Sequence, residues 1–135
     1  LAHVQGRTDD QWRQAATGAT TFQAREEGTV LGTLSLVTAY DHDPDPEPGV
    51  LWICAMYVTA VGRGRGMCGL LVDAALAEAR HLGATTVGLH VASDNDAARR
   101  CYERAGFVAT GVWEEHRLYP PTRMDEMRIA IDANK

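Results

Sequence analysis

Apolar residues run without interruption from Leu51 to Val58 and then recur at helical spacing from about Gly66 to Leu82. An apolar run of this length is typical of a strand buried on both faces, and we expect it at the centre of a sheet. The second segment predicts an amphipathic helix, because its apolar residues return every three or four positions: Leu70, Leu71, Ala74, Ala75 and Ala79. A turn rich in glycine and arginine joins the two, and the rest of the chain is organised around this unit.

The flanking segments predict further strands and short helices. A hairpin is expected over 20–40, because two extended stretches meet at Glu27-Gly28. Segment 41–49 alternates acidic residues with proline, which favours neither a helix nor a central strand and predicts an exposed loop. The other expected elements are a helix at 8–16, strands at 84–92, 107–113 and 127–131, and a helix from Asn95 to Arg104 that ends at Gly106.

These elements predict an α/β fold of the α+β type, with a mixed central sheet and flanking helices in one domain over residues 1–135. The net charge of −5 argues against nonspecific nucleic-acid binding. No apolar run is long enough to span a membrane, and no signal peptide opens the chain, so we expect a cytoplasmic protein. The first residue is Leu1 rather than Met, which suggests that residues upstream are missing.

The three cysteines, Cys54, Cys68 and Cys101, are dispersed and show no spacing typical of a zinc site. Their apolar surroundings predict buried thiols in a reducing compartment. We expect no metal.

The glycine-rich turn before the long helix has the composition of a phosphate site. The first N–H groups of a helix lack intrahelical partners and lie at the positive end of its dipole, and glycines let an anion approach them closely. Arg63 and Arg65 add positive charge. Gly64-x-Gly66-x-x-Gly69 also matches the dinucleotide pattern, with Asp94 after the next strand. Against a dinucleotide-binding oxidoreductase, the turn is long, it carries two arginines, and too little chain follows Asp94.

A second motif changes the interpretation of this turn. Arg63-x-x-Gly66-x-Cys68 is followed by Asn95-x-x-Ala98-x-x-Cys101-Tyr102-x-x-x-Gly106-Phe107. The two motifs, in this order and at this separation, resemble the GNAT superfamily, the Gcn5-related N-acetyltransferases. The resemblance implies a split mixed sheet with acetyl-CoA where two parallel strands diverge. Cys68 stands where that family usually has Gly or Ala, Ala60 replaces a common proline, and the family's first strand and helix are not visible before Thr8.

The resemblance also implies roles for individual residues. The main chain of Met56, Tyr57 and Val58 would pair with the pantetheine amides, and Asn95 would contact the pantetheine arm. Tyr102 would protonate the departing thiolate of CoA, as a phenol can; the alternative is a tyrosine that only packs in the core. The complete set implied for the cofactor is Met56, Tyr57, Val58, Arg63, Gly64, Arg65, Gly66, Met67, Cys68, Asn95 and Ala98.

The general base is left open by the sequence. Some members of the family use a glutamate on the strand before the turn, where this chain has Trp52. The candidates are a water chain or one of four side chains: His90, Glu114, Glu115 and His116. For His90 a buried structural role is the alternative.

The expected activity is transfer of an acetyl group from acetyl-CoA to a primary amine by direct attack, without an acyl-enzyme on Cys68 or Cys101. The acidic segment 41–49 and Glu114-Glu115 make a cationic acceptor plausible, such as an amine antibiotic, a polyamine or a peptide amine. The alternative of a different class is a domain that binds or senses acyl-CoA without catalysis. Dimers are usual in the family, which makes a homodimer an expectation; no nucleic-acid or membrane partner is expected.

Overall fold

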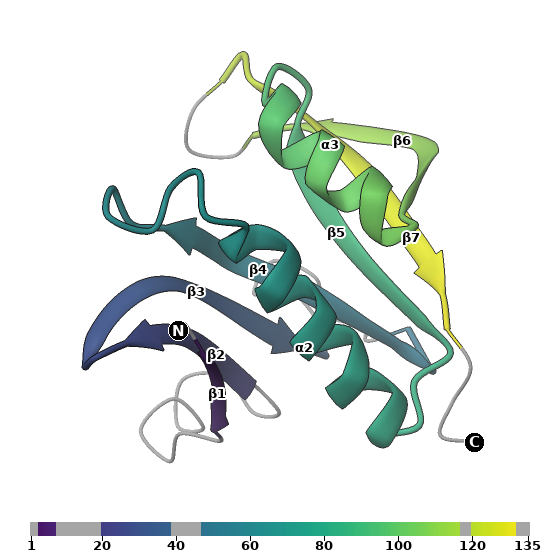
Figure 1. Cartoon of the computed structure of the whole chain (residues 1–135). Helices are drawn as coiled ribbons and strands as arrows, with labels where there is room; N and C mark the ends of the chain where they lie inside the picture. The colour runs from purple at the N-terminus through teal and green to yellow at the C-terminus, as the bar shows by residue number, and fades with distance from the viewer. Residues whose placement is uncertain (1–2, 8–19, 39–46, 117–119, 132–135) are drawn as a thin grey trace.

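A single mixed sheet carries the described part of the chain in a computed structural model (Figure 1), which describes residues 3–7, 20–38, 47–116 and 120–131. The strand order is β1-β2-β3-β4-β5-β7-β6, and all neighbours are antiparallel except β4 and β5. The strands are β1 (His3–Arg7), β2 (Thr20–Glu26), β3 (Thr29–Val37), β4 (Val50–Val58), β5 (Thr86–Ala92), β6 (Val108–Glu115) and β7 (Arg123–Ala130).

Two helices follow the two parallel strands. Helix α2 (Met67–His81) comes after β4 and packs on β3, β2 and β4, whereas α3 (Asp96–Ala105) comes after β5 and lies beside α2. Figure 1 shows both helices on the same side of the sheet, α2 over its first half and α3 over its second half. Neither helix is long and apolar enough to cross a membrane.

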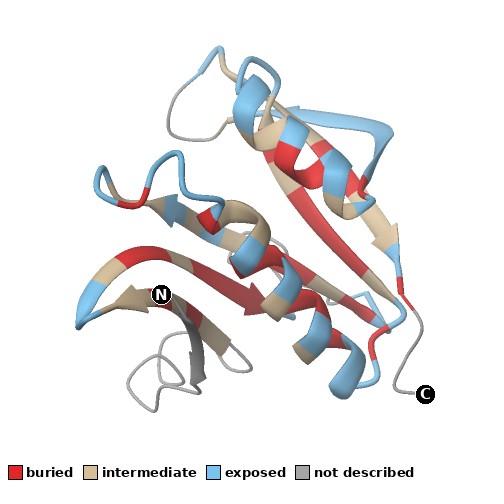
Figure 2. Cartoon of the chain, viewed as in Figure 1, coloured by how far each residue is buried: buried red, intermediate tan, exposed pale blue. Residues whose placement is uncertain are grey.

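The main core lies between the sheet and the helices. Its completely buried side chains include Leu34, Leu71 and Leu89, and Figure 2 shows this burial along the strands beneath the helices. A smaller buried cluster of Val37, Val50 and Trp52 forms separately from it. Successive side chains of a strand point to opposite faces, so Trp52 and the core residue Ile53 lie on opposite sides of β4.

The two halves of the sheet meet along a very short seam. The parallel pairing of β4 with β5 covers only Val50–Trp52 opposite Thr86–Gly88. Beyond these residues the two strands are not paired, although β4 continues to Val58 and β5 to Ala92. The predicted split sheet is therefore confirmed.

Most predicted elements are confirmed, with two differences. The hairpin at 20–40, the long helix and the helix ending at Gly106 are present. Strand β1 has no counterpart in the sequence prediction, and β7 begins at Arg123 instead of at 127, because it pairs with both β5 and β6 over its polar first half. The predicted helix at 8–16 and most of the predicted loop at 41–49 lie outside the described residues.

Candidate active site

The second half of β4 is exposed toward the opening between the two strands. A register shift relative to β3 falls between the pairs Thr33–Tyr57 and Ser35–Cys54, and Ala55 within it has φ of 52°. Such a bulge leaves the extra residue outside the ladder and bends the strand. Tyr57 is 56% exposed, although sequence analysis predicts a strand buried on both faces. The prediction fails here because β5 has already diverged from β4.

A cavity of about 620 Å³ occupies the space between the diverging strands. It is lined by residues on both faces of the sheet, because the missing pairing leaves an opening through it. Its walls contain one predicted site residue of β4, Met56, and three of the α3 segment, Asn95, Ala98 and Tyr102; the predicted Tyr57 and Val58 do not line it.

Tyr102 reaches this cavity from α3. Its side chain is 5% exposed, and its ring meets Phe107 edge to face with a centroid distance of 6.0 Å. Burial raises the pKa of the Tyr102 phenol above its usual value, because the charged phenolate is poorly solvated there. Tyr102 is thus a core residue and a cavity residue at once, and its phenol stays protonated over the whole neutral range.

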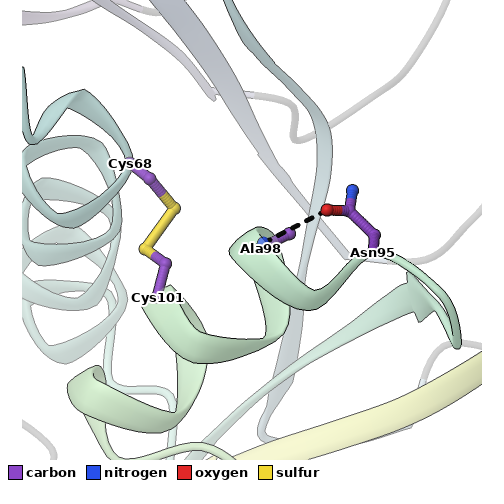
Figure 3. The surroundings of a disulfide bond; sticks show 4 residues. All are labelled: Cys68, Asn95, Ala98 and Cys101. Atoms are coloured by element: carbon purple, nitrogen blue, oxygen red, sulfur yellow. Dashed lines mark hydrogen bonds between the residues drawn. A yellow bond between two sulfur atoms is a disulfide. The ribbon is translucent and has the colours of Figure 1, made fainter. Parts of the chain in front are cut away.

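Asn95 fixes the start of α3. Its side-chain oxygen accepts a hydrogen bond of 3.2 Å from the Ala98 N–H, which caps the helix (Figure 3). Asp96 in the first turn adds a favourable charge at the same end. The helix ends at Gly106 with φ of 111°, a conformation that suits glycine.

The turn before α2 is built differently. Gly64 and Gly66 both have positive φ, and Gly66, the N-cap of α2, provides no side-chain cap; the first turn of α2 contains no acidic residue. A second cavity, of about 730 Å³, lies between this turn and α3. Its lining includes most of the predicted phosphate residues, Arg63, Gly64, Gly66, Met67 and Cys68, and also Val58, which was predicted to contact pantetheine.

Arg65 lies in the same turn but its side chain is used elsewhere. Its guanidinium donates a hydrogen bond of 2.6 Å to the Glu26 carboxylate of β2, and Arg65 is not among the residues that line the second cavity. From the sequence alone, Arg63 and Arg65 are equal sources of positive charge. The structure separates them, because Arg65 is paired with Glu26 at the end of β2, whereas Arg63 lines the cavity.

The prediction of dispersed buried thiols is wrong for two cysteines. Cys68 and Cys101 form a disulfide with a Cα–Cα distance of 6.5 Å (Figure 3), a normal separation for such a bond. The physical reason is the packing of α2 beside α3, which brings together residues 33 positions apart. Cys54 keeps its thiol and lines the cavity between β4 and β5.

The candidates for a general base separate clearly in space. His90 and His116 both line the cavity between β4 and β5, whereas Glu114 and Glu115 do not. Leu89 and Val91 pack in the main core, so His90 lies on the opposite face of the sheet. There its ring stacks on that of Trp52, with a distance of 5.4 Å between the ring centroids. Tyr102 on the helix side and His90 on the other side thus border the same cavity.

Several residues near the two cavities have no signal in the sequence motifs. Arg104 and Asp73 line the second cavity, and Thr122 and Met124 line the first. Arg104 is three positions after Cys101, and this spacing places both on one side of α3. The position of Thr122 and Met124 depends on the return of β7 to β5, which local sequence patterns do not contain.

The order of the strands removes the dinucleotide interpretation of the glycine pattern. After β5 the chain continues into β6 and β7, which are antiparallel to their neighbours. A doubly wound dinucleotide fold would continue with parallel strands and crossover helices.

Comparisons with known proteins agree with this geometry. In structure the chain resembles yncA of Salmonella typhimurium, solved with its cofactor acetyl-CoA, with a TM-score of 0.75 and 21% identity over 93% of this chain and 71% of that chain. It also resembles spermidine N-acetyltransferase from Vibrio cholerae in complex with CoA and spermine, with a TM-score of 0.71 and 22% identity over 89% of this chain and 70% of that chain.

Two curated relatives are mycothiol acetyltransferases. The protein from Rhodococcus erythropolis is 33% identical over 106 residues, which is 78% of this chain and 35% of that protein. The protein from Mycobacteroides abscessus is 43% identical over 62 residues, 46% of this chain and 21% of that protein. The chain thus spans about a third or less of the curated relatives that it matches. The model of the acetyltransferase (GNAT) family matches residues 2–107, and the chain therefore belongs to this family.

Proposed function

We propose that this chain is an acetyl-CoA-dependent N-acetyltransferase, and that residues 1–135 form one such domain. The observation that carries the proposal is the opening between β4 and β5, which the buried Tyr102 borders and beside which the uncapped start of α2 lines a second cavity. An open strand can pair with the pantetheine amides, and an uncapped helix end can bind the pyrophosphate. A buried phenol can protonate the CoA thiolate that leaves. Family membership supports the same activity.

The cofactor would lie along β4 and across the start of α2. Main-chain groups of Met56, Tyr57 and Val58 would pair with the pantetheine amides on the side that β5 has left. The pyrophosphate would bind the backbone of Arg63, Gly64, Arg65, Gly66, Met67 and Cys68, where free helical N–H groups and the dipole favour anions. Asn95 and Ala98 would border the pantetheine arm. The Salmonella and Vibrio neighbours, solved with acetyl-CoA and with CoA, support this use of the fold.

The chemistry follows from a proton donor placed inside the cavity. The neutral amine attacks the thioester carbon, and the tetrahedral intermediate collapses with loss of the CoA thiolate. Tyr102 would donate its phenolic proton to that thiolate, because burial keeps the phenol protonated. The amine loses one proton during the transfer, and this proton restores the phenol through solvent.

The proton of the incoming ammonium would leave toward His90 or His116. Both line the cavity, and imidazole is the side chain whose usual titration range includes neutral pH. His90 lies on the face opposite the helices, from which the amine could approach while the cofactor occupies the helix side.

We propose a primary amine as the acceptor, in a small molecule or a peptide. The acidic residues of segment 41–49 and Glu114-Glu115 favour a cationic acceptor. A spermidine N-acetyltransferase, which by its name acetylates an amine, is among the similar structures. We further propose a homodimer; the edge strand β6 exposes Val108, Val112 and Trp113, which a second copy could cover.

A parallel thermal-shift titration with acetyl-CoA, CoA and NADH tests the proposal. A ligand specific for the folded state at a hundredfold excess over Kd stabilises by about 2.7 kcal/mol. We expect acetyl-CoA and CoA to raise Tm and NADH to leave it unchanged; a rise with NADH alone would contradict the proposal. A panel of amines assayed for thiol release then follows. Binding without turnover of any amine would support the acyl-CoA sensor instead.

A further inference from the structure

Two of the links between the halves of the molecule lie on either side of the cofactor opening. At one place, β4 and β5 are paired over three residues each, Val50–Trp52 and Thr86–Gly88. At the other, the disulfide connects Cys68 of α2 with Cys101 of α3. Helix α2 packs on β2, β3 and β4 and belongs to the first half of the sheet, whereas α3 follows β5 and belongs to the second half. The disulfide is therefore a covalent bridge between the halves, beyond the point where the strands separate.

The bridge lies in the wall of a cavity. Cys68 and Cys101 both line the cavity of about 730 Å³ between the glycine-rich turn and α3. Cys68 is the second residue of α2 and is half-buried, whereas Cys101 is 8% exposed. Arg63 of the turn and Arg104 of α3 line the same cavity from its two sides. The distance between these sides depends on how α2 and α3 are held.

We propose that Cys68 and Cys101 form a reversible thiol–disulfide site whose oxidation state sets the affinity for acetyl-CoA. The proposal rests on the proposed function, since it assigns this cavity to the nucleotide part of the cofactor. The oxidised form has the higher affinity. The cavity is present with the bond formed, and a crosslink that holds a site in its binding geometry lowers the entropy lost on binding.

The exchange partner is a low-molecular-weight disulfide. In the reduced protein, the Cys68 thiolate attacks one sulfur of that disulfide, forms a mixed disulfide and releases one small thiolate. The Cys101 thiolate then attacks the sulfur of Cys68 and releases the second small thiolate, while the two cysteine protons pass to the two thiolates. The protein dithiol is oxidised to the disulfide, and the small disulfide is reduced to two thiols.

Cys68 is the residue that begins this exchange. It is the more accessible of the two cysteines, and it lies in the first turn of α2, where negative charge is stabilised. Cys101 is buried against the core and reacts only with a sulfur already carried by Cys68. Cys54 is on β4 and lines the other cavity.

The first measurement concerns the bond itself. The wild-type protein is equilibrated either with a small disulfide or with the corresponding thiol. It is then alkylated with no further reductant added, and the modified cysteines are located by mass spectrometry. We expect alkylation of Cys54 alone after oxidation, alkylation of all three after reduction, and full reversal between the two states. The loss of the crosslink lowers Tm by about 10 °C. Alkylation of Cys68 and Cys101 under both conditions would overturn the proposal, as would a bond that excess thiol leaves intact.

The second measurement is the Kd for acetyl-CoA in both redox states. We expect reduction to weaken binding by about tenfold in wild type. Cys68→Ala, which introduces a residue that the family motif accepts, should bind as the reduced wild type does and should not respond to reductant. Cys54→Ala is the matched control and should keep the tenfold ratio between its two forms. Equal Kd values for oxidised and reduced wild type would overturn the proposal.

The two proposals fail in different ways. If the bond forms and breaks reversibly with its effect on Tm, but acetyl-CoA binds neither form, the proposed function is wrong and the claim about affinity falls with it. If acetyl-CoA binds equally well in both redox states and is turned over, only the thiol–disulfide proposal is wrong.

Discussion

The helices α2 and α3 begin in opposite ways, although each follows one of the two parallel strands. The start of α3 is satisfied internally, because Asn95 accepts a hydrogen bond from the Ala98 N–H and Asp96 complements the dipole. The start of α2 has neither a side-chain cap nor an acidic residue. It is preceded by glycines with positive φ and by Arg63, which lines the adjacent cavity.

This difference shows that the start of α2 is the less stable of the two helix starts when no ligand is bound. A side-chain cap contributes about 1 kcal/mol to a helix, and α2 does without it. Its first N–H groups remain accessible to a ligand, and a phosphate can supply the hydrogen bonds and the charge that the chain does not. In our proposal α2 binds the cofactor, while α3, which is capped by Asn95, holds Tyr102 for proton transfer.

The largest effect is expected for Tyr102→Phe. The variant keeps the ring that packs on Phe107 but loses the phenolic proton, so we expect kcat to fall by about 10²- to 10⁴-fold. The Kd for acetyl-CoA, measured by calorimetry, should change by less than about twofold, since no binding contact of α2 is altered. A fall in affinity with kcat unchanged would reverse the roles that we assign to the two helices.

The pH dependence of the wild type tests the same residue. Burial raises the pKa of Tyr102 in the folded protein, so the phenol stays protonated beyond the usual range of a tyrosine. We therefore expect kcat to show no alkaline decline from this group below about pH 10. The folded state also binds this proton more tightly than the unfolded state, and stability should fall as the pH rises above that value.

An intermediate effect is expected at the start of α2. Arg63→Gln should weaken acetyl-CoA binding by about five- to tenfold, because it removes a charge from the cavity wall. Arg65→Gln is the matched control: its guanidinium is paired with Glu26, and we expect less than about a twofold change. Equal losses in the two variants would contradict the distinction between these arginines.

The smallest effect is expected at the start of α3. Asn95→Ala removes the cap and should lower the free energy of unfolding by about 1 kcal/mol, measured by urea denaturation. Asn95→Ser can accept the same hydrogen bond and should recover most of this loss. If Asn95 also contacts pantetheine, both variants should weaken acetyl-CoA binding while only the alanine variant loses stability.

The sequence allowed prediction of features that depend on neighbouring residues. Helix α3 was predicted because its cap at Asn95 and its stop at Gly106 are local signals, and the motif around Gly66 marks the start of α2. Strand β1 has no such signal: five residues, HVQGR, become a strand only because β2 offers an edge to pair with. The disulfide was missed for the same reason, since it depends on how two helices pack.

The candidates for the general base could be named from the sequence, but they could not be distinguished from one another. From the sequence, His90, His116, Glu114 and Glu115 are equivalent candidates. The arrangement of β5, β6 and β7 around the cavity separates the histidines, which line it, from the glutamates, which do not. The differing environments of Arg63 and Arg65, two residues apart in one turn, could not be predicted either. They depend on the position of Glu26 on a distant strand.

The three-residue seam between β4 and β5 also has a consequence for folding. Strands β1 to β4 pair with their neighbours along the chain, whereas the seam joins strands separated by the whole of α2. Contacts between distant segments pay a larger loop-closure entropy and tend to form late. We expect the hairpins to fold first and the long-range pairings of β5, with β4 and with β7, to close afterwards, so that the opening between β4 and β5 is created late in folding.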